Sequence, residues 1–445
     1  MPDFLLEQPA FSMPGVAFIY VFMPLSLFFY YIIPHRLRPA ALLWITLAFL
    51  LLAQPRVVPV LVLCVLLDYL AVRMMERFDN RPAARKLWAG FAIAKNLTVI
   101  IFAGRLPGFG GMMLLGAAVY CVSSLDMVLT FYRREYPYER SIMRIGLHGL
   151  FFPRLYAGPV QPYREFAPQL AQIHFNLRSL TVGFGQFVQG GLKTALIGRQ
   201  CGVLYLAVSG FPAHEITVLS LWSASALFAF CIYFTLSGFC DMAQGIGAMF
   251  GIFLPRNFYY PYQSRGAGDF FERFNMTVTA FLRRIVSCVP TAAEPLCLLL
   301  TGMLFGLWFG LRVNYLLWGV FLAVFVLLER WVFRRLLMIT PTLICRIITF
   351  GAVLLSFALM AAPTAADGIL HMRGMLGAAG YAPYNDMILH QLTTNWPVLL
   401  IAVFLSTNAV NLLVLAVHRS IPRVTDGILA AANMILLVLL TAVIY

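Results

Sequence analysis

The chain has 445 residues, of which 61% are hydrophobic and only 11% are charged. Soluble globular proteins carry about 25% charged residues, so this composition excludes a soluble protein of this size and is typical of a protein that faces lipid. The formal net charge of +14 comes from short basic clusters between apolar runs, a placement that indicates membrane topology and argues against nucleic-acid binding.

Apolar runs long enough to cross a bilayer recur along the chain. A transmembrane helix needs about 20 mostly apolar residues. Two stretches are less regular than the rest: residues 142–160 are interrupted by prolines and glycine, and residues 295–328 are long enough for a hairpin of two short helices. Hydropathy predicts the other spans at residues 15–33, 40–53, 57–75, 87–104, 108–132, 180–208, 216–250, 341–362, 396–417 and 428–445.

Clusters of Lys and Arg predict the orientation of these spans. If every cluster is cytoplasmic, the first five spans alternate without conflict and the N-terminus lies outside. If residues 142–160 and 295–328 are inserts that return to the same side, the alternation continues and both termini lie outside. The longest polar loop, residues 363–395, is too short to hold a core of its own. The sequence therefore predicts one membrane domain over residues 1–445, and no cleavable signal peptide is evident at its start. The basic clusters lie at residues 35–38, 73–86, 133–144, 256–284, 329–335 and 418–423.

Several charged side chains fall within or near the apolar runs. A charge at the middle of a bilayer is costly, so such residues either pair with one another to fix helix packing or line a polar interior. The eight cysteines form no C-x-x-C pair and lie mostly in apolar runs, so they predict neither a disulfide framework nor a metal site. The charged residues are Asp68, Lys95, Asp126, Lys193, Arg199, Asp241 and Arg312.

The middle of the chain is not a plain span. Residues 255–262 (PRNFYYPY) are rich in aromatic rings, contain two prolines and cannot continue a helix. Residues 269–275 (DFFERFN) then begin an amphipathic helix, with Asp269 as its expected cap. Irregular backbone at membrane depth survives only where protein or water covers it, so the segment predicts a lined cavity or a cytoplasmic re-entrant region. The alternative is an ordinary interfacial belt of aromatic residues.

Three stretches together resemble the membrane-bound O-acyltransferase (MBOAT) family. Residues 151–160 (FFPRLYAGPV), followed by YREF at 163–166, look like the family's F-F-P-x-L-x-A-G-P-I run and its Y-R-E-F. Residues 233–262 resemble its S-G-Y-S-D-M-A-I-G-L-G and F-P-x-N-F-x-Y-P-Y motifs in order and spacing. Residues 306–319 stand where the family has G-L-W-H-G-A-x-W-N-F-x-L-W-G. The resemblance is strongest over residues 140–330 and points to the bacterial branch, which acylates exported polymers such as alginate or teichoic acid.

This resemblance implies an all-α polytopic fold, in which about 11 spans plus re-entrant segments surround a central cavity. It implies a place in the bacterial inner membrane, contact with membrane lipid, and periplasmic or membrane partner proteins of an acylation pathway. An acyl thioester or an acyl carrier protein would be the donor only if the chain is active, and no metal ligand set is evident. The residues that it implies for the cavity are Asp241, Asn257, Arg273, Trp308, Arg312, Asn314 and Trp318.

The chain departs from the family at the positions that carry its chemistry. Asn275 replaces the histidine of F-W-x-R-W-H, and Phe309 replaces the histidine of L-W-H-G. Arg284 replaces the acidic residue of L-R-D, and the segment after it is short. Acyl transfer to a hydroxyl needs a base for the hydroxyl proton, and histidine suits that task because its pKa lies near neutrality. Neither replacement can accept the proton.

One other histidine lies near the motif region. His148 stands in the stretch that enters residues 151–159 and is the one weak candidate for a substitute base. The alternative for His148 is a satisfied polar residue in a packed helix.

Three functions remain open at this stage. The first is a family-fold protein that lacks the usual acyl transfer and acts as a partner, scaffold or acyl- or lipid-binding subunit of an envelope pathway. The second is an active O-acyltransferase with replaced catalytic groups. The third is a lipid or small-molecule transporter that uses the same cavity. The two missing histidines and the short loop favour the first, although a shared fold does not fix function.

Overall fold

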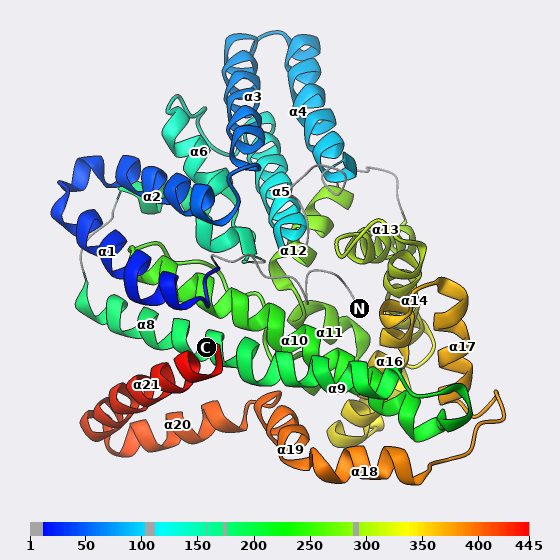
Figure 1. Ribbon diagram of the computed structural model, residues 1–445. Coiled ribbons are helices and arrows are strands. Elements are labelled where there is room, and N and C mark those ends of the chain that lie inside the picture. Colours follow the sequence, from blue (N-terminus) through cyan, green and yellow to red (C-terminus); the bar gives the residue numbers. More distant parts are fainter. Residues whose placement is uncertain (1–11, 103–111, 157, 172–175, 288–292, 445) are drawn as a thin grey trace. The chain divides into compact units, whose positions relative to one another are not determined.

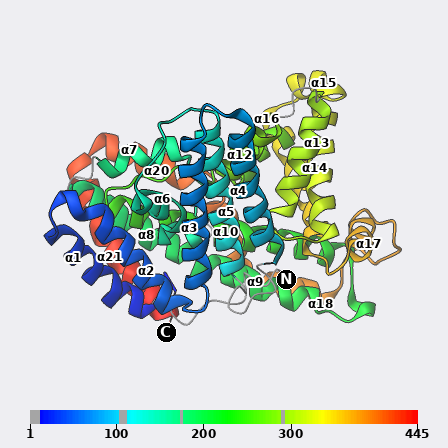
Figure 2. The same ribbon diagram turned by 90° about the horizontal axis from the view of Figure 1, so that it is seen from above.

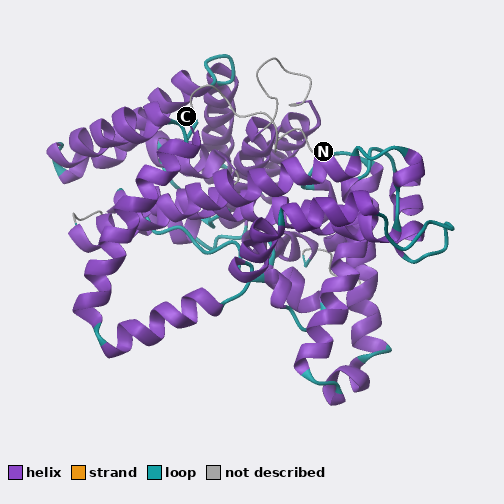
Figure 3. Cartoon of the chain, turned by 60° about the horizontal axis from the view of Figure 1, so that its bottom comes forward, coloured by secondary structure: helices purple, strands orange, loops and turns teal. Residues whose placement is uncertain are grey.

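The computed structural model describes residues 12–102, 112–156, 158–171, 176–287 and 293–444 (Figure 1). Within these ranges the chain consists of helices and loops, with one isolated antiparallel bridge between Phe258 and Phe274 (Figure 3). The all-α prediction is therefore confirmed. The chain divides into two compact units, which are described separately.

The N-terminal unit comprises Pro2–Gly191, Phe239–Arg256 and Leu437–Tyr445. Helices α3, α4 and α5 lie side by side in it (Figures 1 and 2). Its helices up to the start of the second unit are η2 (Phe18–Phe22), α1 (Met23–Ile32), η3 (His35–Leu37), α2 (Arg38–Ala53), α3 (Val58–Arg77), α4 (Pro82–Phe102), α5 (Met112–Tyr132), α6 (Ile142–Leu150), η5 (Phe152–Tyr156), α7 (Tyr163–Ala171) and α8 (Leu177–Leu192).

A buried ion pair joins α3 to α4 in this unit. The Lys95 ammonium lies 2.7 Å from a carboxylate oxygen of Asp68, and both side chains are almost fully buried. The Tyr120 hydroxyl of α5 donates to the other carboxylate oxygen at 2.5 Å. The prediction that some of the charges within apolar runs pair to fix helix packing is confirmed for these two residues.

The central unit comprises Leu192–Gly238 and Asn257–Leu436, so α10 is shared between the two units. Its elements are η6 (Lys193–Gly198), α9 (Arg199–Ser209), η7 (Ala213–Glu215), α10 (Val218–Met249), η8 (Pro261–Gln263), α11 (Ala267–Arg273), α12 (Met276–Val286), α13 (Glu294–Leu307), α14 (Val313–Trp331), α15 (Arg334–Ile339), α16 (Thr342–Ala361), α17 (Ala365–Met375), α18 (Asp386–Thr394), α19 (Trp396–Leu405), α20 (Ala409–Ser420) and α21 (Pro422–Ile444).

Helices α13 and α14 form the hairpin that the sequence predicts for residues 295–328 (Figure 2). Glycines let the two backbones approach closely, as small residues do in membrane helix pairs. A Cβ added to Gly302 would lie 2.5 Å from the carbonyl oxygen of Gly319. The turn between the helices contains Gly310 at φ +151°, a backbone conformation that side chains disfavour.

Six helices in the described part of the chain are long and apolar enough to cross a membrane, and one bent helix pair would add a seventh. The number of about 11 spans stays a prediction, because some predicted spans are shorter helices here and residues 103–111 lie outside the described ranges. The six are His35–Ala53, Val58–Arg77, Val218–Met249, Val313–Trp331, Thr342–Ala361 and Gly427–Ile444.

Two predictions about the C-terminal third are wrong. Residues 396–417 are not one helix, because the chain breaks between α19 and α20. There the hydroxyls of Ser406 and Thr407 donate to carbonyls of the last turn of α19, at 2.7 and 2.6 Å, and so compete with the backbone for them. Residues 363–395 are not a plain polar loop, because α17 and α18 begin there behind the capping side chains of Thr364 and Asn385.

Candidate functional site

The segment that follows α10 pairs with the segment that leads into α12. The backbone N–H of Tyr259 donates to the carbonyl of Arg273 at 2.9 Å, and the N–H of Met276 donates to the carbonyl of Asn257 at 2.8 Å. The bridge between Phe258 and Phe274 lies between these two bonds. The backbone carbonyl of Asn257 and the backbone N–H of Tyr259, in the predicted irregular segment, thus have protein partners, as a segment covered by protein requires.

Asn275 occupies a left-handed backbone position between α11 and α12, at φ 55° and ψ 51°. Asparagine tolerates this conformation better than most residues, and histidine shares that tolerance. The Asn257 side-chain amide donates to Oδ1 of Asn275 at 2.9 Å. In turn, Oδ1 of Asn257 accepts from the backbone N–H of Thr277 at 3.0 Å and from its hydroxyl at 2.8 Å. The Asn257–Asn275 pair is buried, so each carboxamide is held in place.

Phe309 lies in a cluster of aromatic rings at the end of α13. Its ring centroid is 5.4 Å from that of Trp318, 5.8 Å from that of Phe305 and 6.5 Å from that of Phe274. Phe274 directly precedes Asn275, so the two positions that carry histidine in the family share one neighbourhood here. Aromatic rings pack around Phe309, and only 6% of this residue is exposed.

Two of the implied cavity residues tie α14 to α16. Asn314 donates to the carbonyls of Leu359 and Ala362 at 3.3 and 2.8 Å, and so satisfies the open end of α16. The indole of Trp318, which is fully buried, donates to the hydroxyl of Ser356 at 3.1 Å. Both side chains therefore have structural partners.

The other implied cavity residues lie in different surroundings. Arg273 donates to Asp269 at 2.6 Å and stands over the Tyr259 ring at 5.5 Å. Trp308 is half-buried and Arg312 is exposed, both in the turn between α13 and α14. Asp241 is half-buried in the part of α10 that belongs to the N-terminal unit.

Asp269 is not the cap of α11, which corrects the sequence expectation. Helix α11 begins at Ala267, and Asp269 lies in its first turn. Glu329 of α14 accepts from the backbone N–H of Ala267 at 2.6 Å and from that of Gly268 at 3.3 Å. The Glu329 carboxylate, from a helix far along the chain, thus accepts the free backbone N–H groups at the start of α11. The residues around α11 alone do not predict this partner.

His148 lies in α6 of the N-terminal unit and is fully buried. Its Nε2 lies 3.0 Å from the carbonyl oxygen of Gln161, and its ring packs edge-on against Tyr163 and Phe166. Its Nδ1 has no hydrogen-bond partner among the described residues. It belongs to the N-terminal unit, whereas Asn275 belongs to the central unit.

Sequence reasoning missed Arg154, which is 1% exposed and donates to the carbonyl of His148. Two of its guanidinium nitrogens, Nε and Nη1, have no hydrogen-bond partner within the described ranges. The sequence contained a sign of this residue, because Arg154 is a charged residue inside the apolar run FFPRLYAG. Arginine is almost never fully buried unless it is paired, so its position in such a run is unusual.

The family model for MBOAT, the membrane-bound O-acyltransferase family, matches residues 133–366, which is more than half of the chain. The chain belongs to the membrane-bound O-acyltransferase family. The sequence resemblance is thereby confirmed, and the matched range contains Asn275 and Phe309.

The names of the similar curated proteins refer to alginate, peptidoglycan and teichoic acid. The probable alginate O-acetylase AlgI of Pseudomonas fluorescens is 26% identical over 70% of this chain and 65% of its own length. The peptidoglycan O-acetyltransferase of Helicobacter pylori is 28% identical over 52% of this chain and 46% of its own length. The teichoic acid D-alanyltransferase of Bacillus subtilis is 25% identical over 41% and 51%. The chain thus spans about two thirds of the first of these relatives and about half of the other two.

Proposed function

We propose that this MBOAT protein is a membrane subunit of an envelope polymer or glycan acylation pathway that works without the family's histidine-dependent acyl transfer. It would act as a partner, scaffold or acyl- or lipid-binding subunit beside periplasmic or membrane proteins of that pathway. One observation carries the proposal. The two positions of the family histidines hold a carboxamide fixed by Asn257 and a phenyl ring packed among aromatic rings.

The chemistry explains why this observation carries the proposal. Transfer of an acyl group from a thioester to a hydroxyl requires a group that accepts the hydroxyl proton, and such general base catalysis contributes about 10²–10⁴-fold. The Asn275 carboxamide has no basic lone pair at neutral pH, and the Phe309 ring has no proton-accepting atom. Both side chains are buried, so neither position offers a water-exposed proton acceptor.

The test compares turnover with pathway function. The purified full-length chain is expected to show no acyl transfer from thioester donors or a charged acyl carrier protein, while deletion of its gene reduces polymer acylation in cells. Asn275→His with Phe309→His is expected to restore no transfer, because a polar ring at 309 would replace one of a packed aromatic cluster. Thioester-dependent transfer by the purified wild-type chain would overturn the proposal.

A second candidate, an active acyltransferase with a different base, rests on His148. Its buried ring has one nitrogen without a hydrogen-bond partner among the described residues, as a proton acceptor would need. His148→Ala in cells tests it, with His371→Ala as the control because His371 also contacts a backbone carbonyl, that of Leu221 at 3.0 Å. Polymer acylation that disappears only in His148→Ala, in a protein that still folds, would replace the first proposal with this one.

The proposed location is the bacterial inner membrane, with the basic clusters in the cytoplasm and both termini outside. Single cysteines would replace Asp3, Tyr445 and Arg283 in a cysteine-free background. An impermeant thiol reagent added to intact cells is expected to label the two terminal positions, which lie outside the described residues, and to leave position 283 unlabelled. Labelling at 283 without labelling at 3 would reverse the orientation.

A further inference from the structure

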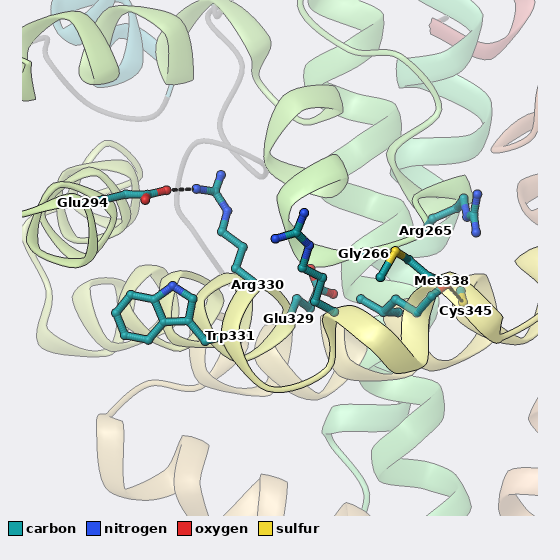
Figure 4. Close-up of a pocket in the computed structure, with 10 residues that line it drawn as sticks. Arg265, Gly266, Glu294, Glu329, Arg330, Trp331, Met338 and Cys345 are labelled. Atoms are coloured by element: carbon teal, nitrogen blue, oxygen red, sulfur yellow. Dashed lines mark hydrogen bonds and ion pairs between the residues drawn. The ribbon is translucent and has the colours of Figure 1, made fainter.

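A cavity of about 620 Å³ lies in the central unit, apart from Asn275 and Phe309 (Figure 4). Ligand pockets commonly measure roughly 300–1,000 Å³, so a small ligand or a headgroup fits in it. Its walls come from the segment before α11, the start of α13, the end of α14, α15 and the start of α16. In Figure 4, Glu294, Arg330 and Trp331 stand on one side and Arg265 and Met338 on the other.

The lining carries more positive charge than its acids neutralise. Glu294 is paired with Arg330, as the dashed line in Figure 4 marks. Glu329 is engaged by the backbone N–H groups at the start of α11. Arg265 and Arg334 also line the cavity, and neither guanidinium has a carboxylate partner within the described residues. Two arginines are therefore available to an anion, and their planar forks suit phosphate.

The lining also includes apolar side chains that are exposed. Trp331 is 66% exposed and Met338 is 67% exposed, and both line the cavity. Exposed apolar side chains continue from them along the chain at Val332, Ile339 and Leu343. These apolar side chains would not increase the affinity of the cavity for a simple inorganic anion. An amphiphile would bury its chain against them.

The place of the cavity at the ends of two helices indicates its depth in the membrane. Helix α14 ends at Trp331 and α16 begins at Thr342, and both are long and apolar enough to span a membrane. The short helix α15 lies between them in the chain (Figure 2), and its sequence RRLLMI places arginines beside apolar residues. Tryptophan and arginine at the ends of spans lie at the headgroup level, and basic ends attract anionic lipid.

We propose that this cavity binds the phosphate headgroup of an anionic phospholipid, with Arg265 and Arg334 on the phosphate and Trp331 and Met338 against the start of the acyl chains. The inference does not depend on whether the chain transfers acyl groups. It assigns a lipid site to the basic end of the α14–α16 pair. Through Gly266, which lines the cavity next to Glu329, that site adjoins the start of α11.

The experiment measures lipid retained by the purified full-length chain in native mass spectrometry. The probes are phosphatidylglycerol, phosphatidylcholine and, as a competitor, inorganic phosphate. Each arginine near a membrane surface contributes about fivefold to anionic lipid binding, so Arg265→Gln with Arg334→Gln should weaken phosphatidylglycerol binding about 25-fold. Arg335→Gln with Arg346→Gln is the control, because it removes equal charge from exposed residues that do not line the cavity.

The expected result is retention of phosphatidylglycerol over phosphatidylcholine by the wild-type and control chains, loss of that preference in the cavity variant, and no displacement by millimolar phosphate. Equal weakening by both double variants would assign the effect to general surface charge and overturn the proposal. Displacement by phosphate would make the site one for a free anion, and this too would overturn it. So would equal retention of the two lipids, or capture of an acidic carrier protein that depends on the same two arginines without any lipid preference.

Discussion

Replacement of Asn257 by alanine tests the buried pair at the family's histidine position. The side chain makes three hydrogen bonds: its amide donates to Asn275, and its Oδ1 accepts from the N–H and the hydroxyl of Thr277. Asn257 is 2% exposed, so water cannot easily replace these partners. The side chain thus supports the start of α12 and holds the Asn275 carboxamide.

The magnitude follows from these three bonds. Each buried hydrogen bond contributes about 1 kcal/mol net, so Asn257→Ala should lower the free energy of unfolding by about 3 kcal/mol. With an unfolding entropy of about 2.1 cal/mol/K per residue over 445 residues, the melting temperature should fall by about 3 °C. Asn395→Ala is the control, because the half-buried Asn395 amide bonds only its own helix turn at Gln391, and its loss should cost about 0.5 kcal/mol or less.

Substitutions at Asn275 separate the side chain from the backbone. Asn275→Gly removes the acceptor of one hydrogen bond but keeps a residue that accepts φ +55°. Asn275→Ala removes the same acceptor and adds left-handed strain of roughly 1 kcal/mol, so it should be the less stable of the two. In a double-mutant cycle of Asn257→Ala with Asn275→Gly, the shared bond should appear as a coupling of about 1 kcal/mol.

Unfolding can be followed with a thiol-reactive fluorogenic dye in detergent, because six of the cysteines in the described ranges are buried in the folded chain and become reactive when it unfolds. The reasoning fails if Asn257→Ala melts within about 1 °C of the wild-type chain, which is roughly what a loss of 0.5–1 kcal/mol would give. It also fails if Asn275→Ala is as stable as Asn275→Gly, since the backbone would then not be held in the left-handed region.

Three further predictions concern other parts of the fold. Gly302→Ala should destabilise the chain by about 1–3 kcal/mol in the dye assay, because the added methyl group meets a carbonyl oxygen of α14 at 2.5 Å. Lys95→Met should cost about 3–5 kcal/mol because it leaves the Asp68 carboxylate buried without its partner, and adding Asp68→Asn should recover part of that loss. Asp79 lies in a loop outside the predicted spans. Its pKa lies below the ordinary value of 3.8, chiefly because the Tyr138 hydroxyl donates a hydrogen bond to it. The Asp79 contribution to stability is therefore present above about pH 4 and is lost as the pH falls through the lowered pKa. In Tyr138→Phe this loss should begin at higher pH, as melting temperatures between about pH 3 and 7 would show.

Each of these has a result that would contradict it. Gly351 of α16 has nothing within 4 Å of an added Cβ, so Gly351→Ala should be neutral, and equal effects at the two glycines would refute the close approach. A double variant of Lys95 and Asp68 no more stable than Lys95→Met would show that the buried charge is not the cause. If the melting temperature of Tyr138→Phe fell at the same acidic pH as that of the wild-type chain, the hydrogen bond from Tyr138 would not be what lowers the pKa of Asp79.

The sequence by itself determined the membrane character, the helical class, the family and the hairpin of α13 and α14. These follow from composition, from apolar run lengths and from motifs of contiguous residues, each of which is a local property of the chain. It also determined the loss of both histidines, because Asn275 and Phe309 stand inside motifs whose neighbours still match. The residues that cap α17 and α18 and the Ser406 that ends α19 are also local features of the sequence. A prediction from average hydropathy misses them because each is only one or two polar residues.

Only the tertiary structure decided which distant groups meet. Asn257 and Asn275, Glu329 and the start of α11, and Asp68 and Lys95 each join different elements, and hydrogen bonds of this kind depend on where backbones approach in space. The cavity that Arg265 and Arg334 line is the clearest example of residues brought together by the fold. In the sequence, each arginine is simply one more basic residue near the end of a helix. Both line one cavity only because the segment before α11 and helix α15 meet in the folded chain.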